Sequence, residues 1–287
     1  MESILFVAMN LRDSNDRAGI WPELVMNMRY STKPGKPGWS VRHVPGWPTI
    51  KYHLGVSLII REVARNAARG RFGTAEFAKC SRDILSVAEA CGGSVEVDGL
   101  QYVKDGMPAV FVANHMGSIE TLVVACLILP FGEATFVLKE SLMHYPVFRH
   151  LVRGIDPITV GRINARDDLK TVLNGGAERL KEGVSVVIFP QATRSPVFDM
   201  AKFNSMGVKL AAKAGVPIIP LAVKTDFLAS GRIHKDFGRV YPSRPIKFRF
   251  GPPIKVSDHP KEGHRQSMEF IVGCLEEWGL PVIRSDG

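Results

Sequence analysis

The residues best suited to chemistry stand in one stretch, FVANHMGSIET, over residues 111–121. A short apolar run, residues 109–113, predicts a buried strand that delivers the imidazole of His115 to its carboxyl end. Ser118 is of a type that caps helices, and Glu120 falls in the first turn of the helix that follows, where the helix dipole favours an anion. Local geometry thus holds a histidine and a carboxylate close together. We interpret them as a base and its orienting partner.

A second stretch, VVIFPQATRS over residues 186–195, runs from a buried strand through a proline into a polar turn. Thr193 and Arg194 place a hydroxyl, backbone amides and a permanently charged guanidinium in one tight loop. Such a loop suits a phosphate, because arginine offers paired donors that stay charged. A purely structural turn is the alternative interpretation of the same residues.

Both stretches belong to a part of the chain that alternates strands and helices. This alternation predicts an α/β fold with a largely parallel or mixed sheet and helices on both faces. Ligands then gather beyond the carboxyl ends of the strands, where both stretches lie. We expect strands near residues 94–97, 109–113, 135–138, 157–160, 185–189, 217–223 and 246–250, and helices near 118–129, 141–152, 165–181, 205–214 and 262–278.

The chain is expected to divide into an N-terminal extension, residues 1–92, and an α/β domain, residues 93–287. Residues 1–48 carry proline and glycine clusters that predict loops. Residues 49–70 have helical periodicity, and residues 74–91 form a second helix that pairs with the first. The first helix has an apolar face and, opposite it, an arginine stripe in which two leucines are embedded. The stripe contains Leu54, Leu58, Arg61, Arg65 and Arg69.

The net charge of +9 is concentrated near the N-terminus, because residues 28–71 carry nine lysines or arginines against the single acid Glu62. A basic block can serve a nucleic acid, an anionic membrane surface or solubility alone. Its amphipathic character favours a helix lying in the headgroup region of a membrane, and a docked helix with a solvated basic side is the alternative. No nucleic-acid-binding module is recognisable, so we expect no nucleic acid partner.

The cellular location is predicted from two sequence signals that the chain lacks. The start of the chain lacks the pattern of a signal peptide, and the longest apolar stretch, residues 122–130, falls short of the roughly 20 residues that span a bilayer. The four cysteines show no metal-ligand spacing and fit buried thiols, and no metal site is expected. We therefore expect a cytoplasmic protein that binds peripherally to the cytoplasmic face of a membrane.

Together, the two stretches resemble the glycerolipid acyltransferase family, which includes lysophospholipid and 1-acylglycerol-3-phosphate acyltransferases. NHMGSIE matches the family's Asn-His, four residues, Asp motif, and FPQATR matches its Phe-Pro-Glu-Gly-Thr-Arg motif. An intermediate block is represented by Lys139, Pro146 and Arg162, and a final apolar block with paired prolines by AGVPIIPLAV, residues 214–223. The four blocks occur in the family's order.

The sequence departs from the family's pattern at three positions. Glu120 replaces an aspartate and is one methylene longer, so its carboxylate must bend back to reach the imidazole. Gln191 replaces a glutamate that in the family helps to hold the polar acceptor. Ala192 replaces a glycine and needs a backbone conformation without positive φ. The resemblance supports the reaction type more firmly than the identity of the acceptor.

The resemblance implies direct transfer of a fatty acyl group from a thioester, on coenzyme A or acyl carrier protein, to a lipid hydroxyl. His115 would be the general base and Glu120 would fix its tautomer. Backbone amides near Gly117 and Ser118 are candidates to stabilise the oxyanion. An apolar tunnel lined by residues 122–129 and the basic helix would hold the acyl chain. No cofactor is implied beyond the thioester co-substrate.

The acceptor is expected to be a lysophospholipid such as 1-acylglycerol-3-phosphate. Its phosphate would be held by Arg194, helped by Thr193, Lys139 and Arg162, and Gln191 would contact its glycerol-like hydroxyls. The alternatives are another acceptor, such as a lyso-aminolipid or glycolipid, and a non-catalytic lipid-binding relative. The residues assigned to the acceptor are Lys139, Arg162, Gln191, Ala192, Thr193 and Arg194.

Overall fold

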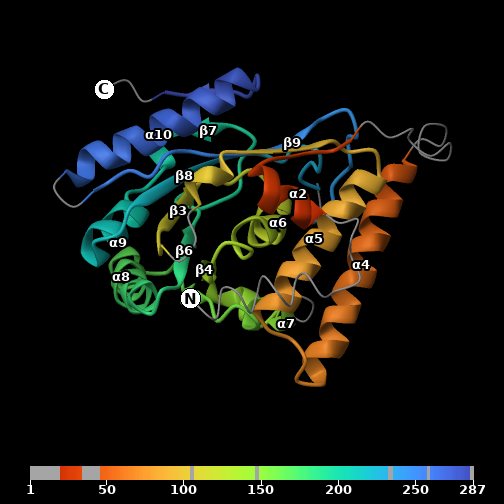
Figure 1. Cartoon of the computed structure of the whole chain (residues 1–287), viewed down its shortest axis with the longest axis horizontal. Helices are drawn as coiled ribbons and strands as arrows, with labels where there is room; N and C mark the ends of the chain where they lie inside the picture. The colour runs from red at the N-terminus through yellow and green to blue at the C-terminus, as the bar shows by residue number, and fades with distance from the viewer. Residues whose placement is uncertain are drawn as a thin grey trace.

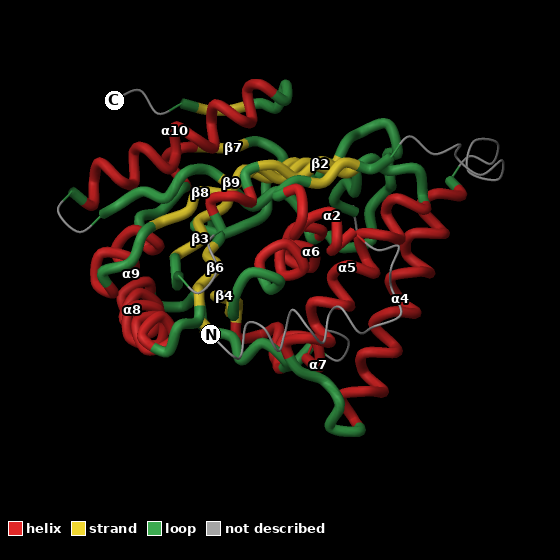
Figure 2. Tube along the Cα trace, in the orientation of Figure 1, coloured by secondary structure: helices red, strands yellow, loops and turns green. Residues whose placement is uncertain are grey.

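Short apolar runs bounded by glycines and prolines form the strands of one eight-stranded sheet (Figures 1 and 2). The computed structural model describes residues 20–33, 46–103, 107–145, 149–231, 235–256 and 259–284. Across the sheet the order is β1 (Tyr30–Ser31), β2 (Val95–Asp98), β9 (Ile246–Phe250), β8 (Ile218–Lys224), β3 (Val110–Ala113), β6 (Ser185–Ile188), β4 (Ala134–Lys139) and β5 (Ile158–Val160). Two further short strands, β7 (Phe198–Asp199) and β10 (Val282–Ile283), pair with each other.

Strand direction sets one edge of this sheet apart. The neighbours β8, β3, β6, β4 and β5 all run parallel, whereas β9 is antiparallel to β8 and β1 is antiparallel to β2. The sheet is therefore mixed but largely parallel, which confirms the predicted fold class. The carboxyl ends of the five parallel strands meet at the same edge, so the loops that follow them are brought side by side.

Helices cover both faces of the sheet, as expected for parallel strands joined by helical crossovers (Figure 1). Two apolar clusters of buried residues fill the two interfaces, one on each face. One face is covered by α4 (Trp47–Ala68), α5 (Thr74–Ala90), α6 (Ile119–Ile128) and α7 (Arg149–Arg153), and the other by α8 (Ala165–Lys181), α9 (Met206–Ala214) and α10 (Pro260–Glu277).

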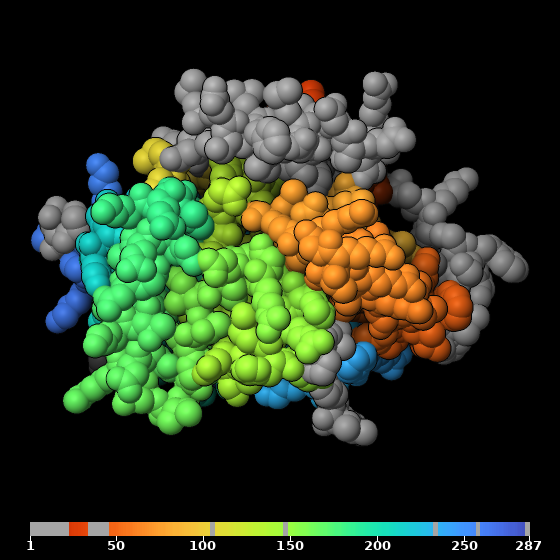
Figure 3. Space-filling view, turned by 90° about the horizontal axis from the view of Figure 1, so that it is seen from below, coloured from red at the N-terminus to blue at the C-terminus, as the bar shows by residue number. Residues whose placement is uncertain are grey.

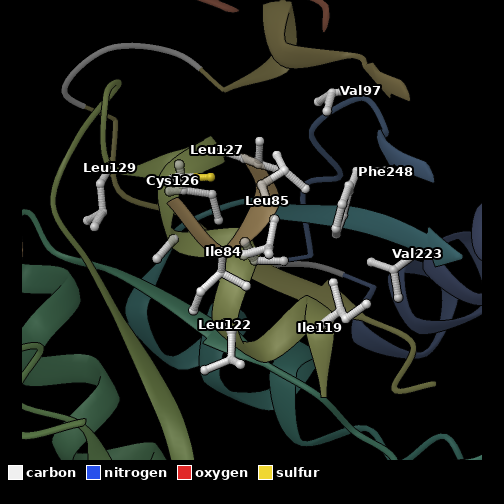
Figure 4. Packing of buried hydrophobic residues seen from close by; sticks show 14 of the residues in the cluster. Ile84, Leu85, Val97, Ile119, Leu122, Cys126, Leu127, Leu129, Val223 and Phe248 are labelled. Atoms are coloured by element: carbon white, nitrogen blue, oxygen red, sulfur yellow. The ribbon is translucent and has the colours of Figure 1, made fainter. Parts of the chain in front are cut away.

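Helix α6 lies at the centre of the first cluster and is apolar on all sides, the pattern of a fully buried helix. Figure 4 shows Leu127 and Ile119 of α6 among Ile84 and Leu85 of α5, with Phe248 of β9 across from them. These five side chains are each at most 1% exposed. Because α6 is held rigidly, its first turn, which carries Glu120, is a fixed reference point for the site.

The boundaries of most elements agree with the sequence. The predicted helix over residues 165–181 and the strand over 246–250 are confirmed to the residue. The predicted helix over residues 141–152 is wrong: a 3₁₀ turn covers Glu140–Met143 and a short helix covers Arg149–Arg153. A proline at position 146, outside the described residues, explains the break, because proline removes a helical donor and disfavours helix in the residue before it.

Residues 1–48 also contain two regular elements that the sequence did not predict. Helix α2 covers Ile20–Asn27 and buries Leu24 completely, and β1 follows it. Strand β1 exists because Tyr30 pairs with Val97 of β2, an antiparallel contact between segments far apart in the sequence. The remainder, residues 1–19 and 34–45, lies outside the described residues.

Helix α4 forms one side of the molecule seen from below, in orange in Figure 3. It buries Tyr52, Ile60 and Val63, whereas Leu54 and Leu58 remain 59% and 55% exposed among the arginines, as the periodicity predicts. Tyr52 and Val63 share one apolar cluster with the sheet. The division of the chain between residues 92 and 93 stays a prediction.

The four cysteines are buried and unpaired, as expected from their apolar surroundings. Among the helices of the described ranges, none combines the length and the apolarity that crossing a bilayer requires.

Candidate active site

The predicted site residues follow the carboxyl ends of neighbouring parallel strands. His115 comes two residues after β3, residues 189–194 follow β6, Lys139 ends β4 and Arg162 comes two residues after β5. Thr225 directly follows β8, on the other side of β3. The sheet therefore gathers at one edge polar groups that are widely separated in the sequence.

His115 and Glu120 are in direct contact. Nδ1 of His115 lies 2.9 Å from Oε1 of Glu120. The Glu120 side chain is fully buried, and the His115 side chain is 12% exposed. Because Nδ1 faces the carboxylate, Nε2 is the imidazole nitrogen left for a substrate, and the ring lines a pocket.

Glu120 has a partner for each of its oxygens. Oε1 accepts the backbone N–H groups of Met116 at 2.7 Å and Gly117 at 2.6 Å in addition to facing His115. Oε2 accepts the hydroxyl of Thr225 at 2.6 Å. Burial opposes the charge, but the hydrogen bond and charge of His115, with the bonds from Thr225 and Gly117, hold the pKa of Glu120 below its ordinary value. The extra methylene of Glu120 is therefore accommodated by a turn that wraps around the carboxylate.

Two expectations for this turn are corrected by the same contacts. Ser118 occupies the N-cap position of α6, but its hydroxyl makes no capping hydrogen bond there. The carboxylate of Glu120 instead accepts the hydrogen bonds that the backbone N–H groups of the turn donate. The amide of Gly117, a candidate for the oxyanion hole, already donates to Glu120 and is not directed at a substrate.

The backbone of His115 is fixed from both sides. Its N–H donates to the side-chain oxygen of Gln191 at 2.6 Å, and its carbonyl accepts from the N–H of Ser195 at 3.0 Å. The preceding residue, Asn114, exchanges two hydrogen bonds with the backbone of Val223, of 2.9 and 2.8 Å. The loop after β6 and the end of β8 thus clamp the histidine between them.

A pocket of about 370 Å³ opens in front of His115. The ring of Phe189 lies 4.8 Å from the imidazole, centroid to centroid, and forms one wall. Five of the six residues predicted to bind the acceptor line this pocket together with His115. They are Lys139, Arg162, Ala192, Thr193 and Arg194.

Gln191, the sixth, does not line the pocket and is only 4% exposed. Its oxygen is occupied by the N–H of His115, so its replacement of the family's glutamate bears on the placement of the histidine. Ala192 has no positive φ, because among the described non-glycine residues positive φ is found only at Met28, Asp156 and Arg162. The backbone conformation expected for Ala192 is therefore present.

Two of the four basic side chains of the pocket already contact other groups. Arg194 forms an ion pair with Asp236, and Arg162 donates a hydrogen bond to the carbonyl of Ala192. Lys139 is exposed and Lys235 also lines the pocket. The lining carries four basic side chains and one acidic one, which suits an anionic group.

A second pocket of about 330 Å³ adjoins the first and shares Ser118, Leu122 and Asp236 with it. Its other walls come mainly from the inner side of α4, including Tyr52, and the lining is largely apolar. The tunnel expected along residues 122–129 is corrected here, because Leu122 alone of these lines either pocket. The remaining residues of that run face the core and are at most 3% exposed.

Sequence reasoning missed Thr225, Phe189 and Asp236. A signal existed for Thr225, since it follows the predicted strand over residues 217–223 and would end beside His115 in a parallel sheet. Phe189 is the first residue of the FPQATR motif, but nothing in the sequence indicates that its ring contacts His115. Asp236 lies in a connection without regular structure, and no feature of the sequence relates it to Arg194.

Parts of this chain are similar in sequence to known proteins. Residues 94–224 match the family model described as Acyltransferase. A 1-acyl-sn-glycerol-3-phosphate acyltransferase of Pseudomonas aeruginosa is 32% identical over 176 residues, which is 61% of this chain and 64% of the relative. The protein of that name from Escherichia coli is 28% identical over 171 residues, covering 59% of this chain and 66% of the relative. The chain thus spans under two thirds of the length of these relatives.

The fold has a counterpart among solved structures. The crystal structure of the 1-acyl-sn-glycerophosphate (LPA) acyltransferase PlsC from Thermotoga maritima superposes with a TM-score of 0.57, at 19% identity, over 81% of this chain and 95% of that chain. At that identity the likeness concerns the fold. Residues 94–224, the stretch that matches the family model described as Acyltransferase, contain both the His115–Glu120 pair and the loop after β6.

Proposed function

We propose that this protein transfers a fatty acyl group from an acyl thioester to the hydroxyl of a lysophospholipid such as 1-acylglycerol-3-phosphate. The observation that carries the proposal is the contact between His115 and the buried Glu120 at the edge of a pocket lined by basic side chains. A base held by a carboxylate beside an anion-binding wall is the arrangement that such a transfer needs.

In the proposed reaction the acceptor hydroxyl attacks the thioester carbonyl while Nε2 of His115 takes its proton. The new ester C–O bond forms through a tetrahedral intermediate, whose collapse breaks the C–S bond. The imidazolium returns the proton to the departing thiolate, so the products are the acylated lipid and a free thiol. Glu120 keeps the proton on Nδ1 in the resting state and stabilises the imidazolium that forms. No covalent acyl-enzyme is needed.

In this proposal the acceptor phosphate lies against the basic side chains of the His115 pocket. Arg194 and Thr193 come from the loop after β6, and Lys139 and Arg162 come from the two strands beyond it. Guanidinium groups bind phosphate oxygens in pairs and remain charged, which suits a dianionic phosphomonoester. Gln191 has a different role in this proposal, because it holds the backbone of His115.

The apolar pocket against α4 is the proposed place of an acyl chain. It opens beside Leu122 and Ser118, which also line the pocket of His115, and it is bounded by the helix that exposes Leu54 and Leu58. An acyl chain drawn from a membrane would pass α4 first. We therefore propose that α4 lies in the headgroup region of an anionic membrane, at its cytoplasmic face, with its arginines on lipid phosphates.

A second acceptor class is favoured by one observation, the carboxylate of Asp236 on Arg194. A carboxylate in the pocket would pair with a cationic head group, such as that of a lyso-aminolipid. Acyl transfer to a panel of lysophospholipid, lyso-aminolipid and glycolipid acceptors, with acyl-coenzyme A and acyl carrier protein as donors, separates the two. Transfer to the phosphate-bearing acceptors is the expected result.

The decisive variant is His115→Ala. General-base catalysis contributes roughly 10²- to 10⁴-fold to a rate, so we expect activity to fall by at least about two orders of magnitude. Thermal unfolding of the variant is measured beside its activity, because the imidazole is also a partner of the buried Glu120 carboxylate. Full activity in a folded His115→Ala protein would contradict the proposed mechanism. Binding of lysolipid by the unmodified protein without turnover of any donor would identify a non-catalytic lipid-binding relative.

A further inference from the structure

Arg162 has an unusual backbone conformation for a residue that lines the pocket of His115. Its φ is 58°, in the left-handed region, and it shares a positive φ with only two other non-glycine residues of the described ranges, Met28 and Asp156. This conformation costs free energy for a residue with a Cβ, whereas glycine adopts it freely. Gly161 precedes Arg162 and is not among the positive-φ glycines. The strain therefore lies on the arginine although a glycine stands next to it.

Packing does not explain this strained conformation. Arg162 and the following Ile163 are both exposed, and Ile163 is 95% accessible. The loop thus leaves an apolar side chain in solvent, while the guanidinium of Arg162 reaches the loop after β6 and donates to the carbonyl of Ala192. Strained backbone of this kind clusters at functional sites. What this conformation achieves is the placement of the guanidinium.

The carboxylate of Asp168 holds the loop in this conformation. Its Oδ1 accepts the N–H of Gly161 at 3.0 Å, and its Oδ2 accepts the N–H of Arg162 at 3.0 Å. Two consecutive backbone donors that share one carboxylate fix the peptide between them. Hydrogen bonds to an ionised acceptor are stronger than those between neutral groups. The free energy that they supply offsets the cost of the left-handed arginine.

Helix α8 does not depend on this carboxylate for its own start. The side chain of Asn164 occupies the N-cap position and accepts the N–H of Arg166 at 3.0 Å. Asp167, in the same first turn, is exposed and also places a negative charge at the positive end of the helix dipole. The N–H of Asp168 donates to the carbonyl of Asn164. The side chain of Asp168 therefore serves the loop before the helix rather than the helix.

The guanidinium that this loop delivers is suited to a phosphate. Arg162 lines the pocket of His115 together with Thr193 and Arg194, which lie on the same loop as Ala192. A guanidinium has five N–H donors in a rigid plane, and the bond to the Ala192 carbonyl uses one nitrogen. This bond fixes the orientation of the plane, so the remaining donors are presented in a constant arrangement.

We propose that Asp168 is a positioning residue for the phosphate of the acceptor and that it acts through Arg162. Without its carboxylate the loop after β5 relaxes from the left-handed conformation, and the guanidinium leaves the carbonyl of Ala192. This inference rests on the proposed acyl transfer to a phosphate-bearing acceptor. Asp168 does not line the pocket of His115, so its effect reaches the acceptor only through the arginine.

Steady-state kinetics of Asp168→Ala tests this role. We expect KM for 1-acylglycerol-3-phosphate to rise roughly tenfold, because a charge-assisted contact is weakened. The value of kcat should change little, and so should the inhibition constant of 1-acylglycerol, the same lipid without the phosphate. Asp168→Asn keeps one acceptor oxygen and should give a smaller rise in KM. The matched control is Asp167→Ala, which removes the same charge from the same helical turn and should leave KM unchanged.

A double-mutant cycle separates positioning from a structural role. In an Arg162→Ala background the guanidinium is absent, so adding Asp168→Ala should not raise the acceptor KM further. Equal factors for Asp168→Ala with and without the arginine would overturn the inference, and so would a rise of the same size in Asp167→Ala. Thermal unfolding is measured for each variant. If Asp168→Ala does not fold, Asp168→Asn carries the same comparisons.

Binding without turnover keeps this inference apart from the proposed function. Calorimetric titration of a short-chain 1-acylglycerol-3-phosphate into the unmodified protein and Asp168→Ala needs no donor. Binding that is roughly tenfold weaker in the variant, in a protein that acylates no acceptor, would retain the role of Asp168 while the proposed function fails. Acyl transfer with the same acceptor KM in both proteins would retain the function and refute the role. Equal affinity of both proteins would refute the role as well.

Discussion

The hydroxyl of Thr225 donates a hydrogen bond to Oε2 of Glu120 across 2.6 Å, inside a fully buried turn. Thr225 lies at the end of β8 and Glu120 in the first turn of α6, so this bond joins two elements that meet only in the folded chain. The longer acid therefore has its own positioning residue.

Thr225→Val removes this donor while keeping the shape of the side chain. Hydrogen bonds to charged groups are worth about 1.5–3 kcal/mol, so we expect kcat to fall at least roughly tenfold with little change in KM for the acceptor. Thr225→Ser should restore most of kcat. In a Glu120→Asp background, whose shorter acid does not reach Thr225, the same change should have little further effect. Equal losses in both backgrounds would argue for a merely structural role.

Gln191 is expected to act through the backbone of His115. Gln191→Leu removes the acceptor of the His115 N–H and should lower kcat by roughly tenfold, since an unsatisfied buried donor costs about 1–3 kcal/mol. Gln191→Glu still offers an oxygen and should keep most of the activity. Steady-state kinetics of the unmodified protein and the two variants measures kcat and KM for the acceptor. A selective change in KM for the acceptor with unaltered kcat would place Gln191 in contact with the lipid instead.

The ion pair between Arg194 and Asp236 predicts opposite effects for two substitutions. Arg194→Ala should raise KM for a phosphate-bearing acceptor by roughly tenfold or more, because a charge-assisted contact is lost. Asp236→Asn should lower that KM, since the acceptor no longer competes with a carboxylate. A parallel series with a lyso-aminolipid measures head-group preference. If Asp236→Asn raises KM for the phosphate acceptor, the carboxylate positions Arg194 and does not compete with substrate.

The lowered pKa of Glu120 predicts how stability depends on pH. An ionised carboxylate with a folded-state pKa below its unfolded value, about 4.3, contributes stability that is fully present above that value. This contribution is lost as pH falls through the folded-state pKa. Glu120→Gln lacks it, so its deficit in unfolding free energy, roughly 1–3 kcal/mol near neutrality, should shrink as pH falls below about 4. Denaturant unfolding of both proteins across this range measures the difference, and a deficit independent of pH would contradict it.

The exposed leucines of α4 predict how the protein meets a membrane. Leu54→Ser together with Leu58→Ser should weaken binding to anionic vesicles by at least about tenfold, because each leucine contributes roughly 1.5–3 kcal/mol when fully buried. Vesicle flotation measures the bound fraction. Ile283→Ser, an exposed apolar side chain 52% accessible and distant in sequence from α4, is the matched control. Equal flotation of the double variant and the control would remove the membrane role of α4.

The sequence by itself determined the strand and helix alternation, the position of His115 at the end of a strand and that of Glu120 one turn into a helix. These are local facts: apolar periodicity, a short turn and a helix start are set by neighbouring residues. The same locality explains why residues 165–181 and 246–250 were placed correctly. It also explains the error over residues 141–152, where apolar periodicity was followed across a proline.

Only the tertiary structure decided which distant groups complete the site. Thr225, Gln191 and Asp236 reach Glu120, His115 and Arg194 because the strand order places β8 and β6 on either side of β3, and because a long connection folds back over the edge. β1 likewise exists only through its pairing with β2. Strand order and long-range pairing depend on how whole elements pack, and this packing cannot be predicted from the residues that are neighbours in the sequence.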